Sequence, residues 1–294
     1  MKPGTYTDMP FDEYKKVKAF SNTWANALEE CPAMLKYLMQ FDDYRDTPAL
    51  RLGRAVHEAV FEPRVFGSEK NYISLPRKFG RTKAEQEAKD LFELENQGKT
   101  ILTQDEWHEA TDIAHAVLST KTASTLIASS KSEVSIFWHC PETNVLCKGR
   151  LDAWNKQEGV ILDLKTTSDS LNEHSLKRVI ATRKYYRQLA WYSYGLDLLG
   201  EPTELQILIF VQKRNPYPVA FKSPSFSAIE QGKREMKELT KQYAKCLESD
   251  KWPGYPDSIS TIELPDYAKK YDVGTGEDFN AYTDFVHEEL VKNG

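Results

Sequence analysis

The run ELQILIFVQK, residues 204–213, is apolar at nearly every position. A strand with one face in water alternates apolar and polar side chains, so a near-continuous apolar run is typical of a strand that is covered on both faces. Such a strand lies inside a sheet that has helices packed against it. The sequence therefore predicts an α/β protein with a central sheet flanked by helices.

The patterns around this run indicate the order of the other elements. The first third looks helical over residues 20–40, 47–62, 82–98 and 104–129, with Ser21 or Asn22 as the candidate N-cap of the first helix and an irregular stretch at 64–81. Three short β-rich runs at 133–140, 145–154 and 159–167 are separated by turn residues and predict a three-stranded meander. A helix over about 173–199, a strand at 218–223 and a helix over 225–249 complete an α/β sandwich with a mixed sheet.

We expect one domain, because the chain of 294 residues has no internal repeat, low-complexity tract or long Pro/Gly linker. The predicted parts are a mainly helical N-terminal part, residues 1–130, an α/β core, residues 131–250, and a partly ordered C-terminal tail, residues 251–294. No run approaches the roughly 20 apolar residues that cross a bilayer. The N-terminus also lacks the apolar segment of a secretory signal. A cytoplasmic location without a membrane partner is therefore expected.

The charge and the cysteines exclude some classes of function. A net charge of −5 argues against a protein that coats nucleic acid through bulk electrostatics, although it allows a local basic track beside an acidic metal site. The four cysteines are scattered and form no CxxC pair. Because iron–sulfur and zinc sites need closely spaced ligands, we expect reduced packing cysteines and neither kind of site.

Two acids and a lysine stand out in the β-rich segment. Strand alternation places Asp163 and Lys165 on one face of residues 159–167, and it groups Arg150 with Asp152 in residues 145–154. If the two strands form a hairpin, Asp152 and Asp163 lie close together and repel each other unless a cation lies between them. Carboxylate oxygens are ligands that Mg²⁺ or Mn²⁺ prefers, and a neighbouring lysine can orient a water. The alternative is a salt bridge between Asp163 and Lys165 at the end of the strand. For the Asp-x-Lys triplet taken alone, this structural role is the commoner one.

Residues on two predicted helices bear on this choice. His57 lies on an otherwise apolar helix stripe and needs a polar partner, which a metal would supply. Gln188 and Tyr192 are four residues apart and share a helix face. An aromatic stripe at this spacing is usually core, but beside Arg183, Lys184 and Arg187 it would also suit contacts to a phosphodiester backbone.

Taken in order, these motifs resemble the PD-(D/E)XK nuclease superfamily, in particular its RecB-like and RecE-like exonucleases. The matching pieces are LGxxxH ending at His57, EVSIFW beginning with Glu133, KGRLDAW with Asp152, ILDLKTT with Asp163 and Lys165, and QxxxY with Gln188 and Tyr192. The residues of these motifs are most similar to those of the RecE-like enzymes, and the resemblance covers about residues 5–250. It implies a restriction-endonuclease-like core.

The resemblance also implies a role for each residue. The metal ligands would be His57, Asp152, Asp163 and the backbone carbonyl of Leu164, with Glu133 as an extra acid near a second metal. Lys165 would position the attacking water, and Gln188 and Tyr192 would support the site or hold the DNA backbone. The candidate DNA contacts are Arg178, Arg183, Lys184 and Arg187. The cofactor would be Mg²⁺ or Mn²⁺, with no iron–sulfur cluster.

The implied activity is a Mg²⁺-dependent DNA exonuclease that degrades linear double-stranded DNA 5′→3′ and leaves 3′ overhangs. The resemblance further implies a homo-oligomeric ring and a single-strand annealing protein as partner. A closed ring would allow a protein of net negative charge to keep a basic inner channel. The alternatives are a single-strand or flap nuclease, or an endonuclease, of the same fold. An inactive DNA-binding module is a third alternative, which the presence of every expected acid and of the lysine disfavours.

Overall fold

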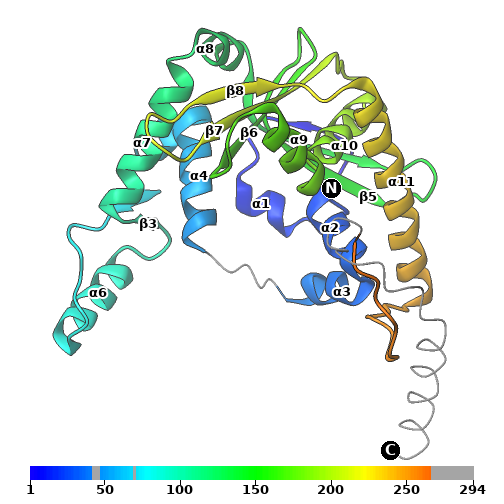
Figure 1. Cartoon of the computed structure of the whole chain (residues 1–294), viewed down its shortest axis with the longest axis horizontal. Helices are drawn as coiled ribbons and strands as arrows, with labels where there is room; N and C mark the ends of the chain where they lie inside the picture. The colour runs from blue at the N-terminus through cyan, green and yellow to red at the C-terminus, as the bar shows by residue number, and fades with distance from the viewer. Residues whose placement is uncertain (42–46, 69–70, 266–294) are drawn as a thin grey trace, which may run out of the picture. The chain divides into compact units, whose positions relative to one another are not determined.

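A computed structural model describes residues 1–41, 47–68 and 71–265 of the chain (Figure 1). By its internal contacts the chain divides into a body, residues 1–251, and a second unit, residues 252–294. The described part of the second unit, residues 252–265, contains no helix or strand. Residues 266–294 of the predicted C-terminal tail lie outside the described residues.

The body is built on a mixed six-stranded sheet in the order β1-β4-β5-β6-β7-β8 (Figure 1). Its strands are β1 Gly4–Tyr6, β4 Lys131–His139, β5 Leu146–Asn155, β6 Val160–Thr167, β7 Leu205–Gln212 and β8 Val219–Lys222. Strands β4, β5 and β6 form the predicted antiparallel meander, and β7 lies parallel to β6 between β6 and β8. This interior place explains the unbroken apolar run of β7 and confirms the predicted α/β fold.

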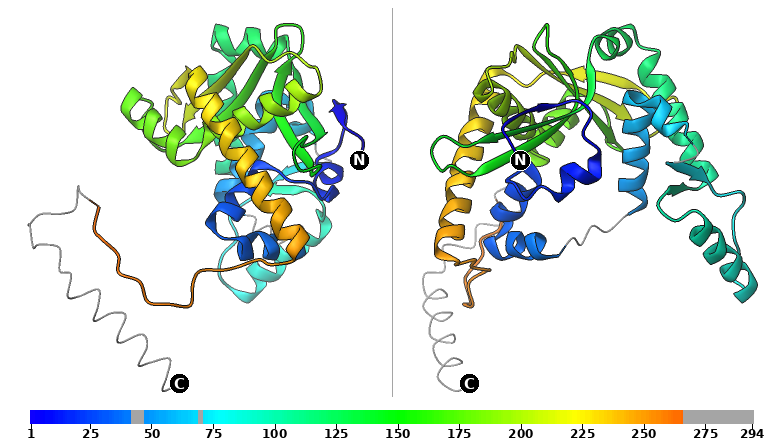
Figure 2. Two further views of the ribbon diagram at one scale, coloured as in Figure 1. Left: turned by 90° about the vertical axis from the view of Figure 1, so that its right-hand side faces the viewer. Right: turned by 180° about the vertical axis from the view of Figure 1, so that it is seen from behind.

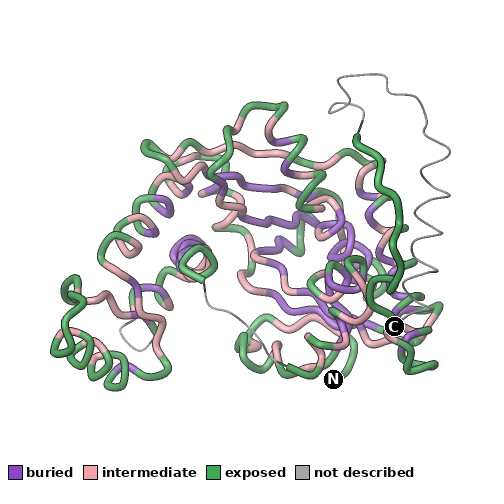
Figure 3. Tube along the Cα trace, turned by 60° about the horizontal axis from the view of Figure 1, so that its bottom comes forward, coloured by how far each residue is buried: buried purple, intermediate pink, exposed green. Residues whose placement is uncertain are grey.

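Helices cover both faces of the sheet, as two further views show (Figure 2). On one face α4, Pro48–Phe61, and α7, Gln104–Leu118, pack against apolar residues of β5, β6 and β7. On the other, α10, Tyr185–Leu198, contacts β4 and β5 and packs along α11, Phe226–Ser249. The buried segments of Figure 3 follow the strands and the inner sides of these helices. None of the helices in the described residues has the length and apolar content that a bilayer crossing needs.

Shorter elements surround this framework. They are α1 Phe11–Lys16, α2 Asn22–Glu30, α3 Pro32–Gln40, α5 Pro63–Phe66, β2 Tyr72–Ser74, α6 Lys83–Glu95, β3 Thr100–Leu102, α8 Lys121–Ala128 and α9 Glu173–Thr182. Strands β2 and β3 pair with each other as a separate parallel sheet. The first strand, β1, joins the main sheet beside β4, so the mainly helical N-terminal part also supplies a strand of the core.

Three predicted helices are each two helices in the structure. The first breaks at the extended Cys31 before Pro32, and residues 104–129 break at Thr120, whose side chain caps α8. Residues 173–199 break at Lys184, which has a left-handed backbone with φ +55°. The expectation of an irregular stretch at 64–81 was wrong in part, since α5 and β2 lie within it, and α1, β1 and β3 were not predicted. Elements of three to six residues leave little periodicity to detect.

The crossing of α10 and α11 depends on Gly232. A Cβ at this position would lie 2.7 Å from the Ala190 Cβ and 2.9 Å from the Arg187 Cα. We expect Gly232→Ala to lower the free energy of unfolding by about 1–3 kcal/mol, because the two helices must move apart. The matched control is Gly53→Ala in α4, where nothing lies within 4 Å of the added Cβ; it should raise stability by about 0.5–1 kcal/mol. Urea unfolding measures both, and equal effects would contradict the close crossing.

Candidate active site

The hairpin of β5 and β6 carries its acids where the two strands stop pairing. The ladder ends at Ala153↔Leu162, so Asp152 and Asp163 occupy the next opposed positions. The Oδ2 of Asp152 instead accepts a hydrogen bond from the Leu164 N–H at 2.7 Å. This break leaves two carboxylates close enough for their charges to interact, as the sequence pattern predicted.

Asp152 also binds His57 from α4. The His57 Nδ1 lies 3.2 Å from the Asp152 Oδ2. Burial disfavours charge on both groups, yet the pKa of His57 is raised and the pKa of Asp152 is lowered, because each stabilises the charged form of the other. Asp152 is therefore the polar partner that the histidine on its apolar helix stripe requires.

Asp163 is fully buried, and within the described residues only one of its oxygens has an ion-pair partner. The Lys165 Nζ forms an ion pair with Oδ2 at 2.6 Å, but among the described residues neither oxygen has another hydrogen-bond partner, and Oδ1 lacks an ion-pair partner as well. Burial raises the pKa of Asp163 to about 6; Lys165 opposes the rise and Asp152 adds to it. A buried carboxylate oxygen without a donor is costly, so this atom is suited to a cation or a proton.

Lys165 is held in place by α10. Its Nζ donates to the Gln188 Oε1 at 3.1 Å and lies 4.9 Å from the centre of the Tyr185 ring. The Gln188 Nε2 in turn donates to the Tyr192 hydroxyl oxygen at 2.7 Å. Burial acts to lower the pKa of Lys165, but the two neighbouring carboxylates outweigh it and the pKa is raised. Tyr192 is buried, and through Gln188 it connects α10 to the ammonium of Lys165.

Glu133 approaches the same carboxylates from β4. It has a left-handed backbone, φ +54°, which interrupts the pairing of β4 with β5 opposite Asp152. The Arg150 Nε donates to the Glu133 Oε2 at 2.6 Å. Burial raises the pKa of Glu133 to about 7, with Asp152 adding to the rise and Arg150 opposing it. Glu133 therefore lies close enough to Asp152 for their charges to interact, and its role as an extra acid near a second metal stays a prediction.

Of these side chains, His57, Glu133, Asp152 and Lys165 line a cleft of about 440 Å³, and the buried Asp163 is not part of its lining. Its charged lining residues are Arg54, His57, Glu58, Glu62, Glu133, Arg150, Asp152 and Lys165. We name it the catalytic cleft.

The oxygen donors in and next to this cleft fit a divalent cation. The carboxylates of Asp152 and Asp163 and the carbonyl of Leu164 are oxygen ligands of the kind that Mg²⁺ and Mn²⁺ prefer, and His57 could add a nitrogen. Within the described ranges, however, no three His, Cys, Asp or Glu side chains form a ready-made metal group. In the structure His57 pairs with Asp152 and Lys165 with Asp163. A cation would compete with these partners for the same oxygens.

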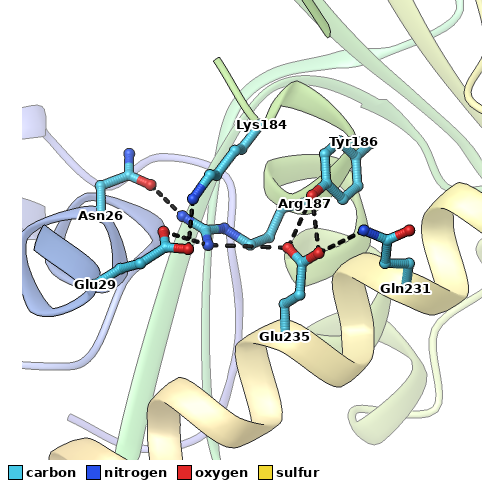
Figure 4. A network of polar contacts seen from close by, with 7 residues as sticks. All are labelled: Asn26, Glu29, Lys184, Tyr186, Arg187, Gln231 and Glu235. Carbon is cyan, nitrogen blue, oxygen red and sulfur yellow. Dashed lines mark hydrogen bonds and ion pairs between the residues drawn. The ribbon is translucent and has the colours of Figure 1, made fainter. Parts of the chain in front are cut away.

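One of the four predicted DNA contacts lies in the interior. Arg187 is fully buried, and its guanidinium donates to the Glu29 Oε2 at 2.7 Å and to the Asn26 Oδ1 (Figure 4). Glu235 of α11 lies on its other side. Arg187 thus joins α10 to α2 and α11, and the expectation that it contacts DNA was wrong, because a buried guanidinium needs its carboxylates. Lys184 pairs with the same Glu29, while Arg178 and Arg183 are exposed.

Arg54 and Phe11 are among the residues of the catalytic cleft that sequence reasoning missed. Arg54 lies three residues before His57 on α4, so helix spacing could have found it. Phe11 comes from the short helix α1, which is linked to the site through a hydrogen bond from Arg150 to the Met9 carbonyl at 3.0 Å. No local sequence pattern predicts such a long-range contact.

A solved structure shares this arrangement of strands and helices. It is a protein from Eubacterium rectale named "Putative exonuclease", 13% identical, with 83% of this chain and 88% of that chain covered and a TM-score of 0.57. At this identity the likeness shows the fold alone. A second structure, SSO0001, is 18% identical over 66% of this chain and 85% of its own. Its TM-score of 0.30 is too low to support a shared fold. No curated protein matches the sequence.

A family model described as "PDDEXK-like domain of unknown function (DUF3799)" matches residues 17–265. The matched span includes α4, the meander β4–β6 and α10, which supply the carboxylates, the histidine and the supported lysine of the candidate site. The mixed six-stranded sheet flanked by helices is consistent with the fold of that family. This chain therefore belongs to the PDDEXK-like domain family DUF3799.

Proposed function

We propose that this protein is a Mg²⁺-dependent DNA nuclease, with Mn²⁺ as an alternative ion, that hydrolyses phosphodiester bonds in the catalytic cleft. The observation that carries the proposal is Asp163, a buried carboxylate with an unpartnered Oδ1, which interacts with the charge of Asp152 and forms an ion pair with the supported ammonium of Lys165. A structural salt bridge alone would not need a second, partly buried acid beside it. Nor would a structural salt bridge need to lie next to a cleft.

The residues have separate roles in this proposal. Asp152, Asp163, the Leu164 carbonyl and His57 would hold the ion, which when bound polarises the scissile phosphate and lowers the pKa of a water. Lys165 holds its ammonium toward the attacking water and the charge that develops on the phosphate. Gln188 and Tyr192 fix the position of Lys165. Glu133 would be an extra acid near a second ion.

The finer proposal is a RecE-like exonuclease that degrades linear double-stranded DNA 5′→3′ and leaves 3′ overhangs for annealing-type recombination. It is supported by the ordered motifs from His57 to Tyr192 and by the fold shared with the protein named "Putative exonuclease". A homo-oligomeric ring and a single-strand annealing protein as partner belong to the same proposal. Arg178 and Arg183 are its exposed candidate DNA contacts.

Digestion of matched DNA forms tests this function. We expect linear duplex DNA to be degraded in Mg²⁺ while covalently closed circles of the same sequence stay intact, because an exonuclease needs an end. End-labelled duplexes, with and without a 5′ phosphate, report the polarity. Cutting of closed circles would support an endonuclease of the same fold instead. Binding without hydrolysis in either Mg²⁺ or Mn²⁺ would leave an inactive DNA-binding module.

A further inference from the structure

Helix α6, Lys83–Glu95, lies outside the hydrophobic core. None of its 13 residues is buried, and no other helix or strand of the described residues packs along it (Figure 1). An isolated helix of this length is marginal in water, because most helices gain their stability from the burial of an apolar face. The fold of the described residues thus leaves α6 without a cover.

One side of α6 contacts the loop that precedes it. The Glu85 Oε2 accepts hydrogen bonds from the Arg77 Nη1 at 2.5 Å and from the Gly80 N–H at 3.2 Å. The Gln86 Nε2 donates to the Gly80 carbonyl at 2.6 Å. These contacts fix which side of the helix faces the rest of the chain, and the opposite side faces away from it.

The side that faces away carries apolar residues. Ala84, Ala88, Leu91 and Leu94 follow one another at spacings of four, three and three residues, so they share one face of the helix. All four are exposed, Leu91 to 57% and Leu94 to 68%. Single exposed leucines are common on protein surfaces, but neighbouring leucines on one helix face are typical of a surface that another molecule covers.

Acidic side chains border the two leucines. At 3.6 residues per turn the order around the helix is Asp90, Leu94, Leu91, Glu95, so one acid lies on each side of the leucine pair. The two lysines of α6 pair with other acids, and among the described residues neither Asp90 nor Glu95 forms an ion pair. We name these four residues, together with Ala84 and Ala88, the α6 face.

The charge and the size of the α6 face restrict what can cover it. DNA and the α6 face of a second copy would both bring negative charge, and like charges placed opposite each other disfavour a complex. A helix of this length is about 20 Å long, so one face offers a few hundred Å², less than the roughly 800 Å² per partner of a standard interface. The α6 face therefore suits a single helix of opposite charge.

We propose that the α6 face docks a basic amphipathic helix of another protein, in which apolar residues recur every three or four positions between lysines or arginines. Leu91 and Leu94 pack against this apolar row, and Asp90 and Glu95 pair with the cations on either side of it. The inference does not depend on the proposed nuclease function, because the α6 face shares no residue with the lining of the catalytic cleft.

Binding of synthetic helical peptides to the full chain tests the proposal. The basic probe is a fluorescent peptide of the length of α6 with a leucine row between lysines, and the acidic probe has glutamates in place of the lysines. We expect the double variant Leu91→Ser and Leu94→Ser to bind the basic probe roughly tenfold more weakly or worse, as measured by anisotropy. The double variant Asp90→Lys and Glu95→Lys should lose the basic probe and bind the acidic one, which also shows that it is folded.

The matched controls lie on α11. Phe226→Ser, at a residue that is 82% exposed, and the double variant Glu238→Lys and Glu248→Lys, at exposed acids, should bind the basic probe like the wild type. No binding of the basic probe by the wild type, equal losses in the α11 variants, or a charge reversal that does not transfer binding to the acidic probe would overturn the assignment. Sedimentation adds one more such outcome: if the leucine variant dissociates an oligomer that the wild type forms, the α6 face joins copies of this chain.

Discussion

Replacing Asp163 by asparagine should abolish DNA hydrolysis and leave the fold intact. The substitution keeps the shape of the side chain but removes the charge that would hold a divalent ion beside Asp152. Loss of such a ligand removes the ion's stabilisation of the developing charge, so we expect activity to fall by a factor of about 10³ or more. Release of nucleotides from linear duplex DNA in Mg²⁺ measures the loss. Asp112→Asn on the exposed side of α7 is the matched control and should keep full activity.

The same variant should be more stable than the wild type in EDTA. Burial raises the pKa of Asp163 to about 6, above its ordinary value of 3.8. When the pKa of a carboxyl group is higher in the folded than in the unfolded state, the protein loses stability as the pH rises from the unfolded pKa through the folded pKa. At pH 7.5 we therefore expect Asp163→Asn to melt a few degrees higher than the wild type, and near pH 3.5 the difference should vanish. A lower melting temperature at pH 7.5, or retained hydrolysis, would contradict the assigned role.

The sequence predicted the fold where local patterns carry the information. The apolar run of β7 and the turn-separated strands β4–β6 are each specified by neighbouring residues, and the structure confirms their order. The break between α9 and α10 escaped prediction because Lys184 adopts a left-handed backbone without a glycine to mark it. Thr120 and Pro32 do carry break signals, but apolar periodicity on both sides outweighed them.

The site also contains residues that a local pattern predicts and residues that only long-range packing brings together. Asp163 and Lys165 are two residues apart on one strand, so alternation alone brings them together. His57, the partner of Asp152, lies by contrast on a helix that packs against the sheet. Only the family motif predicted that the two residues belong to one site. Arg187 shows the limit of reasoning from charge. The sequence presents it as one cation of a basic cluster, while its carboxylate partner Glu29 is 158 residues away and draws it into the interior.

Lys165→Met should remove most of the turnover while preserving metal binding. Methionine retains the length of the side chain but lacks the ammonium that would orient the water and stabilise charge on the phosphate, effects that typically contribute about 10² to 10⁴ in rate. The ion's oxygen ligands stay in place, and Asp163 loses a competitor for its Oδ2. Mn²⁺ affinity, measured by calorimetry, should therefore be equal to or higher than that of the wild type.

Two further variants separate this role from a structural one. Lys131→Met, an exposed lysine at the start of β4, should change neither turnover nor Mn²⁺ affinity. Gln188→Leu removes the acceptor that holds the Lys165 Nζ but leaves the ammonium, so it should reduce turnover less than Lys165→Met does. If Lys165→Met loses Mn²⁺ binding together with turnover, the lysine maintains the shape of the carboxylate site and does not act on the water. If Gln188→Leu is as inactive as Lys165→Met, the ammonium acts only from the single position in which α10 holds it.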